Sequence, residues 1–82
     1  MRLASTSEFA AFVRGQRLAA NMTQEALAQA VGKSRRWVHD LEAGRVDPSF
    51  SAALMVASAL GYSMNLEENA SSPVLDAIFE AL

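Results

Sequence analysis

Apolar residues recur at helical spacing in four blocks of this 82-residue chain, and polar or turn-forming residues separate the blocks. Phe12 and Val13 follow Phe9 by three and four positions, which places all three on one face of a helix. The pattern predicts four helices, at about residues 5–20, 24–31, 35–43 and 49–60. The inward residues of the second and third are expected to be Leu27, Ala28, Val31, Val38 and Leu41.

Residues at the block boundaries support these limits. Ser5, Thr23 and Ser34 precede the first three blocks, where a side-chain hydroxyl can accept a free backbone N–H of the opening turn. Gly32 and Gly44 follow the second and third blocks, where a chain leaving a helix often needs a left-handed residue. The second and third helices are too short to be stable alone, so the rest of the chain must support them.

The fourth block is apolar on nearly all sides. Its inward face is expected to be formed by Phe50, Leu54, Ala57 and Leu60. Met55 and Val56 lie on the other side, and no charged residue occurs between Asp47 and Glu67. A helix of this kind must be covered on more than one face. In so small a domain, we expect a second copy of the chain to cover it at a homodimer interface.

A short segment after Gly61 alternates apolar and polar residues, the pattern of a strand at about 62–66. A single strand has no sheet of its own, and its backbone groups need hydrogen-bond partners. Pairing with its own copy across a two-fold axis would supply them. We therefore add Tyr62, Met64 and Leu66 to the expected dimer interface.

The last residues differ from the rest of the chain. Residues 67–71 read as a polar, acidic linker, and Ser72 with Pro73 can open a final helix at about 73–82. Its apolar stripe could fold back on the core or could serve as an arm for another protein, and fraying is a third possibility. The chain is thus divided into a domain of residues 1–66 and a C-terminal segment of residues 67–82.

Composition excludes several classes of function. The sequence has no cysteine and one histidine, His39, so neither a disulfide framework nor a metal site is expected. No nucleophile stands in a catalytic motif, which makes an enzyme the least favoured class, and no cofactor is implied. No stretch approaches the roughly 20 apolar residues that a membrane span needs, and no signal peptide is evident. We expect a cytoplasmic protein.

The second and third blocks together predict two short helices joined by a tight turn. Arg35 and Arg36 stand on the outer side of the second of these helices. This arrangement is a helix-turn-helix, in which the second helix is presented to the major groove of DNA.

The distribution of charge agrees with this reading, although the net charge of the chain is −2. All seven basic residues lie at or before position 45, together with four acids, so this part carries +3. The remainder has five acids and no base and carries −5. The local field, not the total charge, steers a protein to phosphate.

The chain from about Phe9 to Leu66 resembles a helix-turn-helix domain of the XRE (Cro/repressor) class. The resemblance is carried by Thr23–Ala28, Gly32–Val38 and Leu41–Arg45. It implies an all-α, lambda-repressor-like bundle of four to five helices, with the 62–66 strand pairing across a dimer. The run Leu60–Leu66 is similar to the end of HipB-like antitoxins, where a short strand closes the dimer.

The resemblance also assigns roles to individual residues. The base-reading positions of the family fall on Arg35, Arg36, His39 and Asp40. Arginine can read guanine through a bidentate contact to O6 and N7. Asp40 could accept from cytosine N4, or it could orient Arg36, four residues earlier. Trp37 is expected to pack against the domain rather than to contact DNA.

A second group of residues is expected to position the domain on DNA. Gln24 begins the second helix, where the family contacts phosphate, and flanking residues could hold further phosphates. The complete phosphate-binding set is Gln24, Lys33, Ser34 and Arg45. Arg17 and Glu42 occupy positions that the family pairs as a structural ion pair between the first and third helices.

Three hypotheses about function follow. The favoured one is a dimeric repressor that binds a palindromic operator in double-stranded DNA. In its narrower form, the protein is a HipB-like antitoxin that represses its own operon and binds a toxin such as a HipA-like kinase. The alternatives are a stand-alone or phage-type regulator without a toxin partner, and an interaction module that no longer reads DNA.

Overall fold

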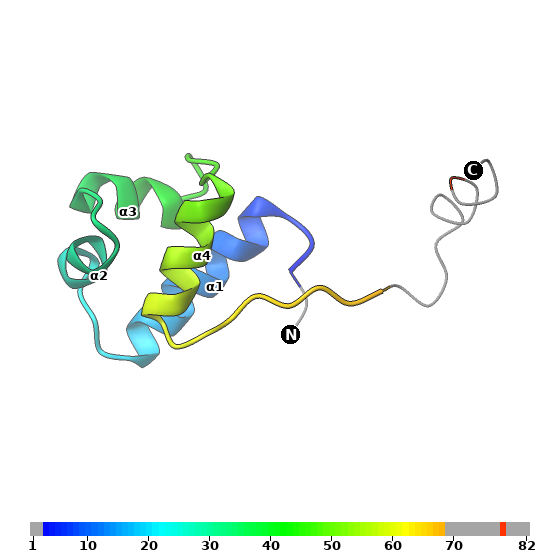
Figure 1. The fold of residues 1–82 in the computed structure, drawn as a ribbon. Coiled ribbons are helices and arrows are strands. Elements are labelled where there is room, and N and C mark those ends of the chain that lie inside the picture. The colour runs from blue at the N-terminus through cyan, green and yellow to red at the C-terminus, as the bar shows by residue number, and fades with distance from the viewer. Residues whose placement is uncertain (1–2, 69–77, 79–82) are drawn as a thin grey trace.

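The computed structural model describes residues 3–68 and residue 78. Within that part the chain forms α1 (Thr6–Ala19), α2 (Gln24–Val31), α3 (Arg35–Glu42) and α4 (Phe50–Ala59) (Figure 1). The four helices predicted from the apolar pattern are confirmed, with ends that differ by a residue or two. Of the final helix predicted at about 73–82, only Ile78 is described, so that prediction lies outside the described residues.

Each of the four helices starts and stops with the same local chemistry. A hydroxyl oxygen accepts a first-turn backbone N–H at every start, from Ser5, Thr23, Ser34 and Ser49. A residue with positive φ follows every end: Asn21, Gly32, Gly44 and Gly61. At each end a backbone N–H reaches the carbonyl five residues earlier, as in a Schellman motif. The helix limits are therefore fixed by local sequence.

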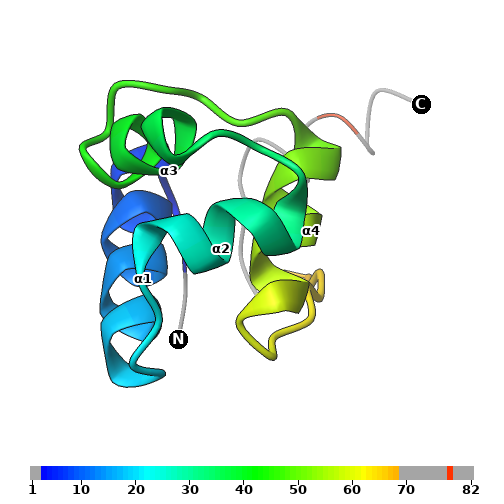
Figure 2. The same ribbon diagram turned by 90° about the vertical axis from the view of Figure 1, so that its left-hand side faces the viewer.

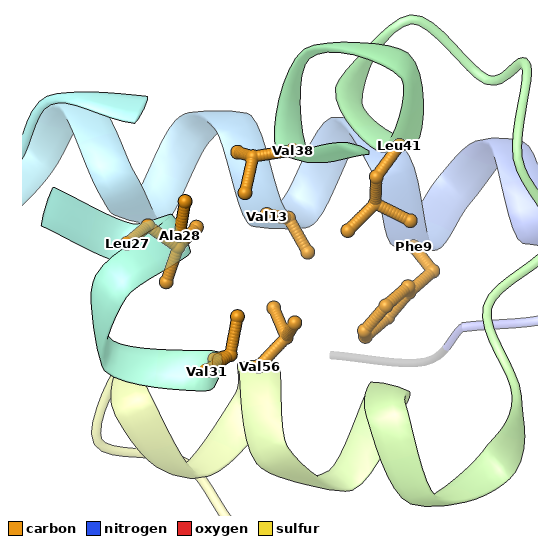
Figure 3. Packing of buried hydrophobic residues seen from close by; sticks show 8 residues of the cluster. All are labelled: Phe9, Val13, Leu27, Ala28, Val31, Val38, Leu41 and Val56. Atoms are coloured by element: carbon orange, nitrogen blue, oxygen red, sulfur yellow. The ribbon is translucent and has the colours of Figure 1, made fainter. Parts of the chain in front are cut away.

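The buried core draws on all four helices. Eight side chains pack together in its centre (Figure 3): Phe9, Val13, Leu27, Ala28, Val31, Val38, Leu41 and Val56. α2 packs against both α3 and α4, and α1 packs against α3. Figure 2 shows α2 between α1 and α4, with α3 lying across one end of the arrangement. One chain thus encloses its own core.

The face that α4 turns to this core differs from the expected one. Phe50 is 73% exposed and Leu54 is also exposed, whereas Ala52, Val56 and Ala57 are buried. The phase of a helix cannot be read from apolar spacing when nearly every position is apolar, because no polar face marks the outside. Small side chains then allow the closest approach to α2. The predicted inward positions Phe50 and Leu54 were wrong.

Val56 requires a second correction. It was assigned to the dimer interface, but its side chain is fully buried within the single chain. Val56 packs in the core cluster and has no surface left for a second copy. It belongs to the fold of one subunit.

Residues 62–68 leave the helical domain after Gly61 and are exposed (Figure 1). They adopt neither helix nor strand, so the strand expected at 62–66 is absent from the described chain. A strand needs a neighbour for its backbone groups, and the described residues offer this segment none. Only Tyr62 is held: its ring packs edge-on against Phe12, with centroids 4.9 Å apart, and its hydroxyl donates to Gln16 Oε1 at 2.9 Å.

Among the described residues, no helix has the length and apolar character needed to cross a bilayer.

Candidate nucleic-acid interface

The turn between α2 and α3 consists of Gly32, Lys33 and Ser34. Gly32 has φ of 68°, a conformation that costs a residue with a Cβ more than it costs glycine. The Lys33 N–H donates to the Ala28 carbonyl at 3.0 Å, which closes the end of α2. Ser34 then caps α3 by accepting the Trp37 N–H at 3.0 Å. The turn is therefore fixed by hydrogen bonds on both sides.

The two faces of α3 differ sharply. Val38 and Leu41 are fully buried and hold the helix to the core. Arg35, Arg36 and His39 are exposed on the outer face, and Asp40 is partly exposed beside them. The structure thus brings the four expected base-reading residues together on one accessible surface, which we call the outer face of α3.

Asp40 makes polar contacts with three basic side chains. Arg36 Nε donates to its Oδ2 at 3.3 Å, and His39 Nδ1 lies 3.4 Å from its Oδ1. Arg45 Nη1 lies 3.9 Å from Oδ1, at the outer limit of an ion pair. Desolvation raises the pKa of Asp40, but the hydrogen bonds from His39 and Arg36 outweigh it, so the pKa lies below its ordinary value. The carboxylate is therefore ionised at neutral pH.

A second ion pair lies beneath the helix. Arg17 of α1 donates through Nε to Glu42 Oε2 at 2.7 Å and through Nη2 to Oε1 at 3.0 Å. Its Nη1 donates to the Met22 carbonyl at 2.8 Å. The hydrogen bond with Glu42 raises the pKa of Arg17, so the guanidinium stays charged although it is buried. This bidentate pair ties the end of α3 to α1.

Gln24 takes part in the same network. Its side-chain amide donates to Glu42 Oε1 at 3.3 Å, which leaves one amide hydrogen for another acceptor. The side chains of Gln24 and Arg35 also line one shallow hollow, together with Arg17, Thr23 and Glu25. The start of α2 and the start of α3 are thus neighbours on the surface.

The remaining expected phosphate-binding residues surround α3. The Lys33 ammonium lies 5.3 Å from the centre of the Trp37 ring, a cation–π distance, and the side chain is exposed. Trp37 itself is partly buried and packs against the core. Ser34 uses its hydroxyl oxygen as a cap but keeps its hydrogen to donate. Arg45 is exposed just beyond the end of α3.

The residues expected at a dimer interface fall into three situations. Met55 and Met64 are exposed, and Leu66 is fully exposed. Tyr62 is half exposed and rests on α1. Val56 lies in the core. The four remaining residues occupy α4 and the segment that follows it.

Several contacts at the interface had no signal in the sequence. The Met22 carbonyl oxygen, which accepts a hydrogen bond from Arg17, is a backbone group that any residue could supply. The bond from Gln24 to Glu42 joins positions 18 residues apart, and the sequence gives no sign that they meet. The Lys33–Trp37 contact could have been inferred, because residues four apart near a helix start are neighbours.

Comparisons with known proteins agree with this geometry. A family model described as a helix-turn-helix domain matches residues 8–70. The chain is similar to the crystal structure of the clp gene regulator ClgR from Corynebacterium glutamicum, with 29% sequence identity and a TM-score of 0.68. That match covers 93% of this chain and 70% of the ClgR chain. A search of curated proteins found no match.

Proposed function

Because the chain belongs to the helix-turn-helix domain family, we propose that it is a sequence-specific DNA-binding transcriptional repressor. The observation that carries the proposal is the position of Arg35 and Arg36. Both are exposed at the start of α3, on a helix held in place by a buried bidentate ion pair. The similarity to ClgR, which is described as a gene regulator, supports the same class of function.

In the proposed complex, the first turn of α3 enters the major groove. Arg35 and Arg36 donate to guanine O6 and N7, and each bidentate contact discriminates by about 1–3 kcal/mol. His39 lies one turn further along and reads a neighbouring base edge. The attachment of α3 to the core supports this base-reading role, because a fixed helix holds its side chains at a constant depth in the major groove.

The phosphate contacts flank this helix. Gln24 donates its free amide hydrogen to one phosphate from the start of α2, and Ser34 donates its hydroxyl from the turn. Lys33 and Arg45 supply positive charge on either side of α3. Such contacts set the register of the protein on the duplex and carry no sequence information themselves.

We further propose that two copies bind a palindromic operator. Met55, Met64 and Leu66 support a dimer because they leave apolar surface exposed on α4 and after it. Residues 62–66 would gain backbone partners by pairing with their own copy. In this proposal residues 1–66 form the DNA-binding and dimerisation domain. Light scattering at micromolar concentration tests it, and a monomer there would exclude this account of the exposed surface.

The narrower form of the proposal is a HipB-like antitoxin, in which residues 67–82 form an arm that binds a HipA-like kinase toxin. The similarity of Leu60–Leu66 to the end of those antitoxins supports it. The alternative is a stand-alone regulator, which the description of ClgR favours. Co-purification with the product of the adjacent gene, before and after deletion of residues 71–82, separates them. Loss of the partner with retention of DNA binding supports the antitoxin.

The central test uses DNA sequences selected from a random pool by the wild-type protein. The double change Arg35→Ala and Arg36→Ala is expected to remove the preference for the selected duplex over a scrambled one. Wild-type binding should also weaken steeply with salt, because phosphate contacts release counterions. Arg14→Ala is the control, since Arg14 is an exposed arginine of α1 to which no base contact is assigned. Retention of preference by the double variant would overturn the assignment of these residues.

A further inference from the structure

Asp40 is an acidic residue on a surface that is proposed to bind DNA through positive charge. It lies on the outer face of α3, where a carboxylate repels phosphate. Yet it is the common partner of Arg36, His39 and Arg45. No ion pair involves Arg35 within residues 3–68, so Asp40 acts on some of the cations of this face and not on others.

The contact with Arg36 leaves the base-reading atoms of that residue available. Asp40 accepts from Nε, and within the described residues neither terminal nitrogen of the guanidinium takes part in this contact, while the side chain is 84% exposed. A guanidinium has five N–H donors, and the outer pair suffices for a bidentate contact with guanine. Asp40 can thus hold Nε of Arg36 while the terminal nitrogens of Arg36 contact a base.

We propose that Asp40 is a specificity-determining residue whose negative charge reduces the attraction of Arg36 for phosphate on DNA of unrelated sequence. This inference rests on the proposed function and deepens it. On unrelated DNA the charge of Arg36 is already partly balanced by Asp40, so Arg36 contributes less counterion release and binding is weaker. On the cognate site, base contacts made by the oriented Arg36 supply affinity that does not depend on releasing it from Asp40.

The low pKa of Asp40 supports this role, because the carboxylate stays charged wherever the protein is at neutral pH. Its effect on affinity for unrelated DNA follows from counterion release. Each additional phosphate neutralised steepens the salt dependence by about 0.9 in log–log slope. Between 50 and 200 mM salt, one such contact corresponds to about a 3-fold greater loss of affinity.

The test compares Asp40→Asn with wild type by fluorescence anisotropy, on the selected duplex and on a scrambled duplex of equal length. Asp40→Asn is expected to bind the scrambled duplex several-fold more tightly, with a salt slope steeper by about 1. The ratio of the two affinities should fall. Asp40→Glu restores the negative charge and should return the salt slope toward that of wild type.

Two controls separate this role from simpler ones. Glu67→Gln makes the same change in net charge on the exposed segment far from α3 and should leave the ratio unchanged (Figure 1). Arg36→Gln should lower the salt slope on the scrambled duplex more in the Asp40→Asn background than in wild type. An effect of Asp40 on helix stability alone would alter the thermal midpoint but not the salt slope.

The outcomes are distinct. Equal effects of Asp40→Asn and Glu67→Gln, or an unchanged affinity ratio, would overturn the inference while leaving the proposed function in place. Weaker cognate binding with unchanged binding to the scrambled duplex would also overturn it and would assign Asp40 a direct base contact. If the wild-type protein selects no sequence from the pool, the proposed function fails, and the inference fails with it.

Discussion

Two ion pairs of α3, Arg17–Glu42 and Arg36–Asp40, lie on opposite faces of one eight-residue helix and differ in geometry and in exposure. Arg17 and Glu42 meet at 2.7 Å with side chains 8% and 3% exposed, and they form two parallel hydrogen bonds. Arg36 and Asp40 meet at 3.3 Å with side chains 84% and 21% exposed. Water screens the outer pair and not the inner one.

This difference separates two tasks that charge performs in one helix. A buried pair is costly to break, because the remaining partner is left charged without water. It therefore fixes where α3 lies. An exposed pair contributes little to stability, so it can orient a side chain that binds DNA without fixing the helix itself. Variants that break one pair at a time test this division.

The largest effect is expected from Arg17→Ala. It leaves Glu42 buried with Gln24 as its only side-chain partner within the described residues, and the free energy of unfolding should fall by about 3–5 kcal/mol. Urea denaturation measures this change. Arg14→Ala, on the same helix but exposed, should change the same quantity by less than about 0.5 kcal/mol. Similar effects of the two variants would contradict the division of tasks.

Ser34→Ala should have an intermediate effect on stability, about 1 kcal/mol from the loss of the α3 cap. Ser49→Ala removes the matching cap of α4 and should cost a similar amount. Only Ser34→Ala should also weaken DNA binding, since Ser34 adjoins the outer face of α3. Thermal unfolding and anisotropy on the same samples measure both. Equal DNA affinity in the two variants would remove Ser34 from the phosphate-binding set.

Arg36→Gln should change the free energy of unfolding by no more than about 0.2–0.5 kcal/mol, the range for an exposed pair four residues apart on a helix. The same change should markedly weaken binding to the selected duplex. Chemical denaturation and anisotropy together give the two numbers. A large loss of stability would show that the outer pair is structural as well.

The smallest effect concerns pH. Because the pKa of Asp40 is lowered in the folded protein, its charge stabilises the fold above the ordinary carboxyl pKa of about 3.9, and that contribution disappears as pH falls through the lower folded value. Asp40→Asn should therefore reduce the loss of stability below about pH 4. Urea midpoints from pH 2 to 6 measure it. Identical pH profiles for the variant and wild type would argue against the contacts of Asp40.

Sequence reasoning succeeded where local chemistry decides the outcome. The limits of α2 follow from Thr23 and Gly32, which act on the backbone within a few residues. The positions of Arg35 and Arg36 on the outer side of α3 follow from helical spacing, since Val38 and Leu41 mark the inner side. The resemblance to known repressors named Arg17 and Glu42, which no local pattern links.

Sequence reasoning failed where packing decides. Phe50 was placed inside because it is large and apolar, but Ala52, Val56 and Ala57 are the buried residues of α4. When a helix has no polar face, the pattern of polar residues does not show which face is buried. Side-chain packing then decides which face lies against the core. The strand expected at 62–66 does not form within the described chain, for a related reason. Alternation describes a surface that could pair, and pairing requires a neighbour that one chain does not contain.

The burial of Val56 has a consequence for how such a protein responds to its own abundance. Because the core is completed within one chain, folding needs no second copy. Where folded subunits associate, the unfolding midpoint should rise with protein concentration. In the proposed dimer, assembly then becomes a separate equilibrium between folded subunits. At low copy number, operator occupancy would rise with the second power of subunit concentration, so a modest drop in expression would release the promoter abruptly.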